Sequence, residues 1–242
     1  MSGSLKTEAI VLRGIRYGEA DRVLHLYTPE RGRVGAIAKG VRRARSRFGG
    51  RLEPFFRLDL VLYEGRSDLL TVTSAETLAG HARLREHEAA LDGAARACDA
   101  VSRLFADGEA HPGVYHLLAN HLALLDGEPQ RATRATALAF RLKLLLAAGF
   151  APQLAACASC GEPEHLVGFS GAAGGVVCGA CEAGSFALDQ DGHDFIVAAL
   201  GRPLSAAPDA PPRALAQADR AILETLEHHA HVQLRAVGSG RV

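Results

Sequence analysis

Four of the five cysteines in the chain fall into two C-x-x-C pairs with seventeen residues between them. This spacing is typical of a zinc ribbon or zinc knuckle. Each C-x-x-C turn can point two thiolates at a centre about 2.3 Å away, so two turns complete a closed tetrahedron. Glycines beside and between the pairs permit the tight turns and the hairpin that this geometry needs. We therefore predict one structural Zn²⁺ with the ligands Cys157, Cys160, Cys178 and Cys181.

Three other uses of these cysteines fit the sequence less well. A pair of disulfides needs an oxidising compartment, and the N-terminal sequence MSGSLKTEAIVLRG contains no export signal. A redox C-x-x-C is expected in a βαβ setting, where a second pair has no role. A catalytic zinc needs an open coordination position, which four thiolates do not leave. His165 lies between the pairs and could replace a cysteine, but we expect it to be a solvated loop residue.

The first third of the chain has the pattern of five short strands, at about residues 7–13, 21–28, 33–40, 55–63 and 69–76. These segments are rich in Val, Leu, Ile and aromatic residues, and turn residues separate them. No pattern of helical length interrupts them. The arrangement predicts a small closed barrel of the oligonucleotide-binding (OB) type over residues 1–78. An SH3-like barrel stays open as an alternative on pattern alone.

From about residue 79 the apolar residues recur at helical spacing. Stretches at 85–107 and 112–126, and a third that starts at Pro129 and stops near Gly149, predict a helical domain over residues 79–150. A zinc-ribbon-like module with the four paired cysteines then occupies residues 151–187. A proline-rich loop at 202–213 lies within the last region, 188–242, whose helices we expect to pack on the helical domain. The predicted fold class is multidomain α+β.

Several other residues of reactive type have simpler structural interpretations. Cys98 lies on an apolar helical stripe and is expected to be a buried packing residue. A cluster of three histidines near the C-terminus is expected on a solvated helix with one histidine on its packing face, rather than at a metal; these are His228, His229 and His231. Glu19 and Asp21 have no nucleophile or metal ligand near them in the sequence, so we interpret them as turn and ion-pair residues.

The net charge of zero hides a division along the chain. Residues 1–68 contain fourteen Lys and Arg against eight Asp and Glu, and the remainder contains thirteen against nineteen. The densest part is residues 39–51, KGVRRARSRFGGR, which we call the basic segment. It has six cations and no acidic residue. A cluster of this kind on a small barrel indicates a site for a polyanion.

The order of basic barrel, helical body and cysteine module resembles the RecO family of recombination mediators. The segments that carry the resemblance are YGEADRV (17–23), TPERGR (28–33), AKGVRRARSRFGGRLEPF (38–55), GFAPQL (149–154) and the cysteine pairs. The resemblance implies a non-enzymatic DNA repair protein that binds single- and double-stranded DNA and anneals complementary strands. It also implies two protein partners, RecR and single-strand-binding protein, for loading recombinase, together with a structural zinc. Arginine replaces much of the family's usual lysine, and it keeps the charge.

The same residues suggest how DNA would be held. Proteins that bind single strands combine a positive groove with aromatic faces on which bases stack. We expect phosphate contacts from the cations of the basic segment, with two weaker candidates at a neighbouring turn: Lys39, Arg42, Arg43, Arg45, Arg47 and Arg51, then Arg31 and Arg33. For stacking we expect Phe48 and then Tyr27. The other aromatic residues of the region, Phe55, Phe56 and Tyr63, are expected in the barrel core or against helices.

No nucleotide or membrane is expected to take part. Neither a Walker-type nor a dinucleotide-binding glycine motif occurs. The longest dense apolar run, residues 144–151, is far shorter than the roughly 20 residues that cross a bilayer. We expect a cytoplasmic protein that associates with the nucleoid when it is on DNA. Two other classes stay open: a zinc-ribbon adaptor that binds protein without DNA contact, and a nucleic-acid enzyme without a recognisable motif.

Overall fold

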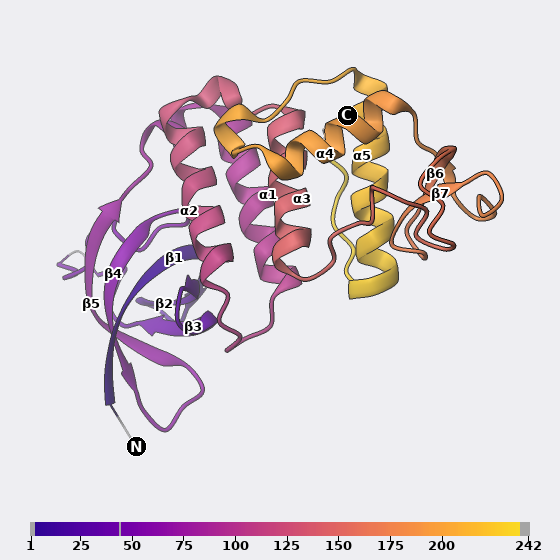
Figure 1. Ribbon diagram of the computed structural model, residues 1–242. Coiled ribbons are helices and arrows are strands. Elements are labelled where there is room, and N and C mark those ends of the chain that lie inside the picture. The colour runs from indigo at the N-terminus through magenta and orange to yellow at the C-terminus, as the bar shows by residue number, and fades with distance from the viewer. Residues whose placement is uncertain (1–2, 44, 238–242) are drawn as a thin grey trace. The chain divides into compact units, whose positions relative to one another are not determined.

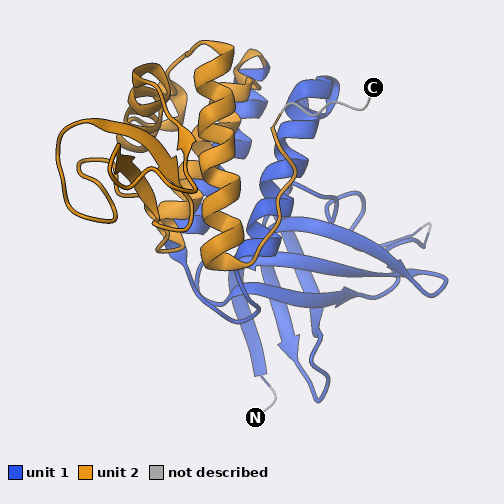
Figure 2. Cartoon of the chain, turned by 90° about the vertical axis from the view of Figure 1, so that its right-hand side faces the viewer, with its two compact units in different colours: residues 1–129 blue, residues 130–242 orange. Residues whose placement is uncertain are grey.

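The computed structural model describes residues 3–43 and 45–237. The chain forms two compact units, residues 1–129 and 130–242 (Figure 2). The division falls within the region 79–150. Two helices, α1 (Glu88–Leu104) and α2 (Pro112–Gly127), therefore belong to the unit that contains the barrel, and α3 (Arg134–Ala147) belongs to the other. The finer division into four domains stays a prediction.

The first unit contains a closed five-stranded barrel with the strand order β1-β2-β3-β5-β4 (Figure 1). Its strands are β1 (Gly3–Tyr17), β2 (Asp21–Thr28), β3 (Gly32–Ala38), β4 (Arg57–Glu64) and β5 (Leu70–Ala79). All neighbours are antiparallel except β3 and β5, which are parallel. The predicted OB-type barrel is confirmed. The first strand is much longer than predicted because its first half pairs with β4 and its second half pairs with β2.

Alternation along the strands builds the barrel core. Leu58, Leu60 and Leu62 of β4 all point inward and are fully buried, together with Leu24 and Leu26 of β2. The strands are strongly tilted, as closure of a small barrel requires. The pairing can be traced once around the barrel from Ile15 of β1. Ile15 pairs with Val23, Val23 with Ile37, Ile37 with Thr71, and Thr71 with Tyr63. Tyr63 of β4 pairs in turn with Ser4 of β1, which lies eleven residues before Ile15.

The helices of the first unit cover one side of this barrel. A short 3₁₀ turn, η1 (Arg83–Glu86), leads into α1, which contacts β1, and α2 contacts β2. The hydroxyl of Tyr115 in α2 donates to Glu8 of β1 (2.7 Å), which also accepts from Arg57 of β4 (2.8 Å). Cys98 is buried in α1, as predicted, and burial raises the pKa of its thiol to about 12.

The second unit begins near the 3₁₀ turn η2 (Pro129–Arg131) and packs α3 against α4 (Gln190–Gly201) and α5 (Pro212–Thr225). The proline-rich loop contains one 3₁₀ turn, η3 (Leu204–Ala206), and α5 continues into a single wider turn, η4 (Leu226–Ala230). A small sheet of three strands, β6 (Leu166–Ser170), β7 (Gly175–Cys178) and β8 (Phe186–Ala187), completes the unit. Within the described ranges, no helix is both long enough and apolar enough to cross a membrane.

A buried carboxylate ties the C-terminal segment to this helical core. Asp219 of α5 accepts from Arg141 (3.4 Å), from Arg134 (3.5 Å) and from the backbone N–H of Val237 (2.9 Å). Arg141 also donates to the carbonyl of Arg235 (2.6 Å). Both charged side chains of the Asp219–Arg141 pair are almost completely buried.

We expect Asp219→Ala to lower the free energy of unfolding of the second unit by about 3 kcal/mol, because it breaks a buried ion pair and leaves the Val237 N–H without its acceptor. Guanidinium chloride unfolding of the full chain would measure this loss. Glu227→Ala removes an exposed carboxylate just beyond the same helix and should change stability by less than about 0.5 kcal/mol. Equal effects of the two substitutions would contradict the role given to Asp219.

Candidate metal centre and nucleic-acid interface

The small sheet of the second unit positions the two cysteine pairs. The β6–β7 hairpin ends at Cys178, and a turn closed by the Cys181 N–H and the Cys178 carbonyl (2.9 Å) presents the second pair. The first pair is fixed by the Ala158 N–H, which donates to the carbonyl of Val176 (2.8 Å), and by the Gly161 N–H, which donates to the carbonyl of Cys157 (2.8 Å). Gly161 has a φ of 81°, a conformation that favours glycine.

The four sulfur atoms converge on one point. The Sγ atoms of Cys157, Cys160, Cys178 and Cys181 all lie within 4.8 Å of one another, and the Cys160 and Cys178 sulfurs are 3.7 Å apart. A tetrahedron with arms of about 2.3 Å has edges of about 3.8 Å, so the spacing suits Zn²⁺. His165 is exposed and is not a member of this cluster. The four residues predicted as ligands therefore lie together and could hold a metal ion.

The charges of the thiols also favour a cation at this point. Backbone N–H groups, first that of Cys178, lower the pKa of Cys157 to about 6. Hydrogen bonding with the neighbouring thiols, first that of Cys160, raises the pKa of Cys181 to about 12. Four thiolates this close repel one another, so all four lose their protons only when a cation occupies the centre. With four sulfur donors the centre would be closed, which suits a structural role.

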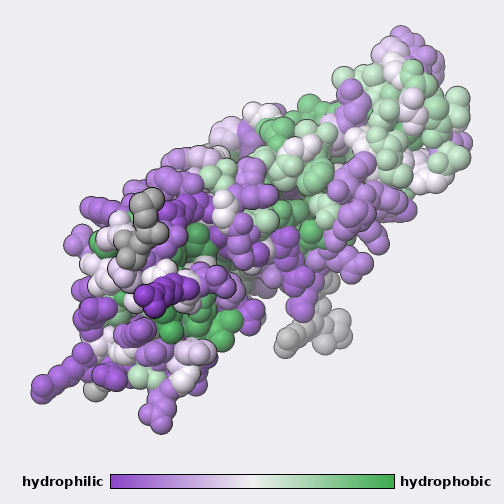
Figure 3. All heavy atoms as spheres, turned by 90° about the horizontal axis from the view of Figure 1, so that it is seen from below, coloured by the Kyte–Doolittle hydropathy of each residue, from purple (hydrophilic) through white to green (hydrophobic). Residues whose placement is uncertain are grey.

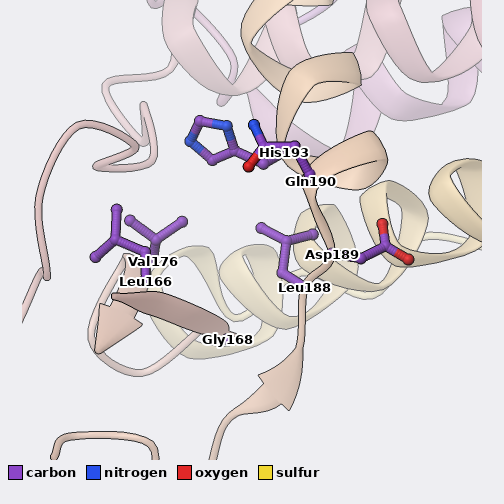
Figure 4. Close-up of a pocket in the computed structure, with 7 residues that line it drawn as sticks. All are labelled: Leu166, Gly168, Val176, Leu188, Asp189, Gln190 and His193. Carbon is purple, nitrogen blue, oxygen red and sulfur yellow. The ribbon is translucent and has the colours of Figure 1, made fainter. Parts of the chain in front are cut away.

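A small pocket beside this module does not provide a further site. It has a volume of about 100 Å³ and is lined by residues of β6, β7 and the start of α4 (Figure 4). Small-molecule sites usually have about 300–1,000 Å³. Its histidine, His193, hydrogen-bonds to the carbonyl of Leu154 (2.9 Å) and so joins α4 to the chain before Cys157. His229 likewise bonds to the carbonyl of Gly171 (2.8 Å), which agrees with the predicted packing role for one histidine of that group.

In the first unit, backbone hydrogen bonds hold the start of the basic segment against the barrel. The N–H of Gly40 donates to the carboxylate of Asp21 (2.7 Å), and the N–H of Arg42 donates to the carbonyl of Ala20 (2.9 Å). Arg22 of β2 donates to the carbonyl of Leu52 and to Glu53. The basic segment therefore begins beside the turn between β1 and β2.

All six predicted cations of the basic segment are exposed. Two of them are also bonded to β5: Arg47 donates to the carbonyl of Val72 (3.3 Å) and Arg51 to that of Ala75 (3.5 Å). Among residues 3–43 and 45–237, Lys39, Arg42, Arg43 and Arg45 have no acidic partner within ion-pair distance. Their charge is therefore available to a polyanion.

Neither aromatic residue predicted for base stacking is accessible. Phe48 is 2% exposed because the basic segment folds back and inserts this ring, with Leu52, into the barrel core. Tyr27 is fully buried and packs edge-on against Phe105, the residue that caps α1. The structure thus contradicts the stacking role of Phe48 and Tyr27.

Arg31 and Arg33, the two weaker candidates for phosphate contacts, both form ion pairs with acidic residues of the first unit. Arg33 pairs with Asp107 and donates to the carbonyl of Ser102, which attaches β3 to the end of α1. Arg31 pairs with Glu64 (3.3 Å). The neighbouring Gly32 lies so close to Glu109 that a Cβ would be 1.8 Å from its carbonyl oxygen. This turn therefore holds the helices to the barrel.

The exposed aromatic residues of the barrel are different ones. Tyr63 is 44% exposed, which contradicts its predicted place in the core or against a helix, and Tyr17 is 59% exposed at the end of β1. The exposure of Tyr63 could have been predicted from the alternation of side chains along β4, because Leu60 and Leu62 face inward and the next residue faces outward. Phe55 is buried and Phe56 packs against the core, as predicted.

These features define a class: an OB-barrel protein with exposed arginines on the barrel and, in its second unit, a cluster of four cysteines that could hold a metal ion. Family models named "Recombination protein O N terminal" and "Recombination protein O C terminal" match residues 1–81 and 89–236. The chain is 39% identical to the DNA repair protein RecO of Anaeromyxobacter dehalogenans (strain 2CP-C), over 96% of this chain and 94% of that one. It is also 39% identical to the RecO protein of Rubrobacter xylanophilus, with 97% and 93% covered.

The chain belongs to the RecO family. A third relative, the RecO protein of Bifidobacterium longum (strain DJO10A), is 38% identical over 72% of each chain. Membership of this family supports a role in DNA repair and recombination.

Proposed function

We propose that this protein binds single- and double-stranded DNA, anneals complementary strands and, with RecR, helps to load recombinase on DNA coated by single-strand-binding protein. The observation that carries the proposal is the basic segment on an OB-type barrel, whose exposed Arg42, Arg43 and Arg45 have no acidic partner within ion-pair distance among the described residues. The barrel is the DNA-contacting part. The two protein partners come from the family membership alone.

Annealing follows from charge without any catalytic group. Two complementary strands repel each other through their phosphates, and a surface that neutralises several phosphates lowers this repulsion. Contacts to phosphates leave the base edges free to pair. The arginines supply the charge, and no nucleotide hydrolysis is needed. The protein therefore acts as a mediator rather than as an enzyme.

The tetrathiolate centre takes a structural part in this proposal. Zinc is the metal that four converging thiolates fit, and it would join the two turns that carry the cysteines. The chain itself provides backbone N–H groups around Cys157 and the packing of Val177, Leu166 and Ala173 around the sulfurs. DNA contact is assigned to the barrel and not to this module.

The experiment that tests the proposal is annealing of two complementary oligonucleotides, one with a fluorophore and one with a quencher, without nucleotide or divalent cation. We expect the protein to accelerate annealing at least about tenfold in about 50 mM salt and much less in about 200 mM salt, because phosphate contacts weaken as salt rises. No acceleration at either salt concentration, together with no DNA binding, would favour a protein-binding adaptor instead.

A further inference from the structure

A continuous row of side chains crosses the outer surface of the barrel. Its members are directly paired from strand to strand, so their side chains point to the same side of the sheet. The residues that alternate with them, such as Leu24, Ala36 and Leu62, belong to the barrel core. The row therefore faces outward. We call it the outer row; it consists of Ile15, Val23, Ile37, Thr71 and Tyr63.

The outer row is largely apolar and accessible at both ends. Ile15 (39% exposed) and Tyr63 (44% exposed) stand at its two ends, and the three residues between them are half-buried. Tyr17 is two residues beyond Ile15 on the same face of β1, and it is the most exposed large hydrophobic residue among those described. Figure 3 shows hydrophobic residues lying open among hydrophilic ones over the barrel.

Positive charge borders this row. Arg13 is exposed and lies two residues before Ile15 on the same face of β1. Directly after β3, Lys39 follows Ile37 by two residues and opens the basic segment. The backbone bonds from Gly40 and Arg42 to the β1–β2 turn fix that segment beside the end of β1 that carries Tyr17.

We propose that the outer row, together with Tyr17, is the surface on which unpaired bases of single-stranded DNA stack, while the basic segment holds the phosphates. This inference rests on the proposed DNA-binding function and specifies how the barrel distinguishes single strands from duplex. Every base has a π face that stacks on an aromatic ring, whereas bases in a duplex are already stacked on one another. Phosphates are presented by both forms.

The dimensions of the row suit this ligand. From β1 to β4 it crosses four inter-strand steps of about 4.8 Å, which gives roughly 19 Å along the surface. OB-type barrels bind about 4–16 nucleotides, so the row matches the short end of that range. The occupant that combines apolar ring faces with regularly spaced negative charge is an unpaired nucleic acid strand.

The test is the double variant Tyr17→Thr/Tyr63→Thr, which removes both rings and keeps residues that favour strands. Binding of a labelled oligo(dT) should weaken roughly 10- to 100-fold, and binding of a blunt duplex at the same salt should change less than about twofold. The conservative variant Tyr17→Phe/Tyr63→Phe keeps the rings and should retain binding. Leu78→Thr replaces another exposed apolar residue of the barrel outside the row and serves as the control.

The outcomes separate this inference from the proposed function. Unchanged oligo(dT) binding by the Thr variant, or equal losses for oligo(dT) and duplex, would overturn the stacking surface while leaving DNA binding intact. Failure of the unmodified protein to bind either probe would instead overturn the proposed function. If the Thr variant does not fold, as judged by thermal unfolding, the single variants Tyr17→Thr and Tyr63→Thr decide the matter, each with about a tenfold loss expected.

Discussion

Replacing one cysteine of each pair, in the variant Cys157→Ser/Cys178→Ser, is expected to release about one zinc per chain and to unfold the cysteine module. The residues that pack this module are largely the ligands themselves, since Cys157, Cys178 and Val177 form its buried cluster. The free energy of metal binding is therefore its folding free energy, which is about 10–16 kcal/mol in isolated zinc fingers. Elemental analysis of the purified protein and hydrogen exchange over residues 151–187 would measure the two effects.

The fifth cysteine provides the control for this experiment. Cys98 is buried in α1 of the first unit and is not a member of the sulfur cluster. Cys98→Ala should keep one zinc per chain. We also expect the zinc-depleted double variant to keep the DNA affinity of the barrel. Full retention of zinc by the double variant would contradict the metal centre, and selective loss of DNA binding by a folded, zinc-free protein would place DNA on the module.

Removing three arginines of the basic segment, in Arg42→Ala/Arg43→Ala/Arg45→Ala, is expected to weaken binding of single-stranded DNA roughly fifty-fold at about 0.15 M salt. This weakening follows if each arginine contacts one phosphate and each contact contributes about 0.7 to the slope of log affinity against log salt. These three were chosen because Arg47 also bonds to Val72 and stacks on the Phe48 ring, so that its loss would disturb the loop. Fluorescence anisotropy of a labelled oligonucleotide would measure the change.

A matched variant removes the same charge elsewhere. Arg96→Ala/Arg103→Ala/Arg202→Ala takes three positive charges from helix α1 and the C-terminal end of α4, two of them from i,i+4 ion pairs on the helix surface. Such pairs contribute little to stability, so the variant should fold. It should bind DNA within about threefold of the unmodified protein if the basic segment is the contact surface. Equal weakening by both triple variants would mean that net charge alone governs binding.

Features that depend on residues close together in the chain could be predicted from the sequence. The two cysteine turns are local, and their spacing was enough to identify all four sulfurs of the cluster. The five barrel strands were likewise found from alternation and turn residues. The exposure of the cations in the basic segment also followed from composition, because charged side chains without partners stay in water.

Features that depend on distant contacts could not be predicted. Burial of Phe48 results from packing against core residues of barrel strands that are distant in the chain. Arg33 is occupied by Asp107, which lies 74 residues further along the chain. The grouping of α1 and α2 with the barrel is equally non-local. The exposed position of Tyr63 is a different case, because the alternation with Leu60 and Leu62 was present in the sequence.

The most direct test of DNA binding by the basic segment is the salt dependence of oligonucleotide binding for the unmodified protein and for the two triple variants. Each phosphate contact contributes about 0.7 to the slope of log affinity against log salt. We expect a steep slope for the unmodified protein and for the control variant, and a slope shallower by about 2 for Arg42→Ala/Arg43→Ala/Arg45→Ala. Identical slopes for all three proteins, or no binding by the unmodified protein, would contradict the assignment of DNA to the basic segment.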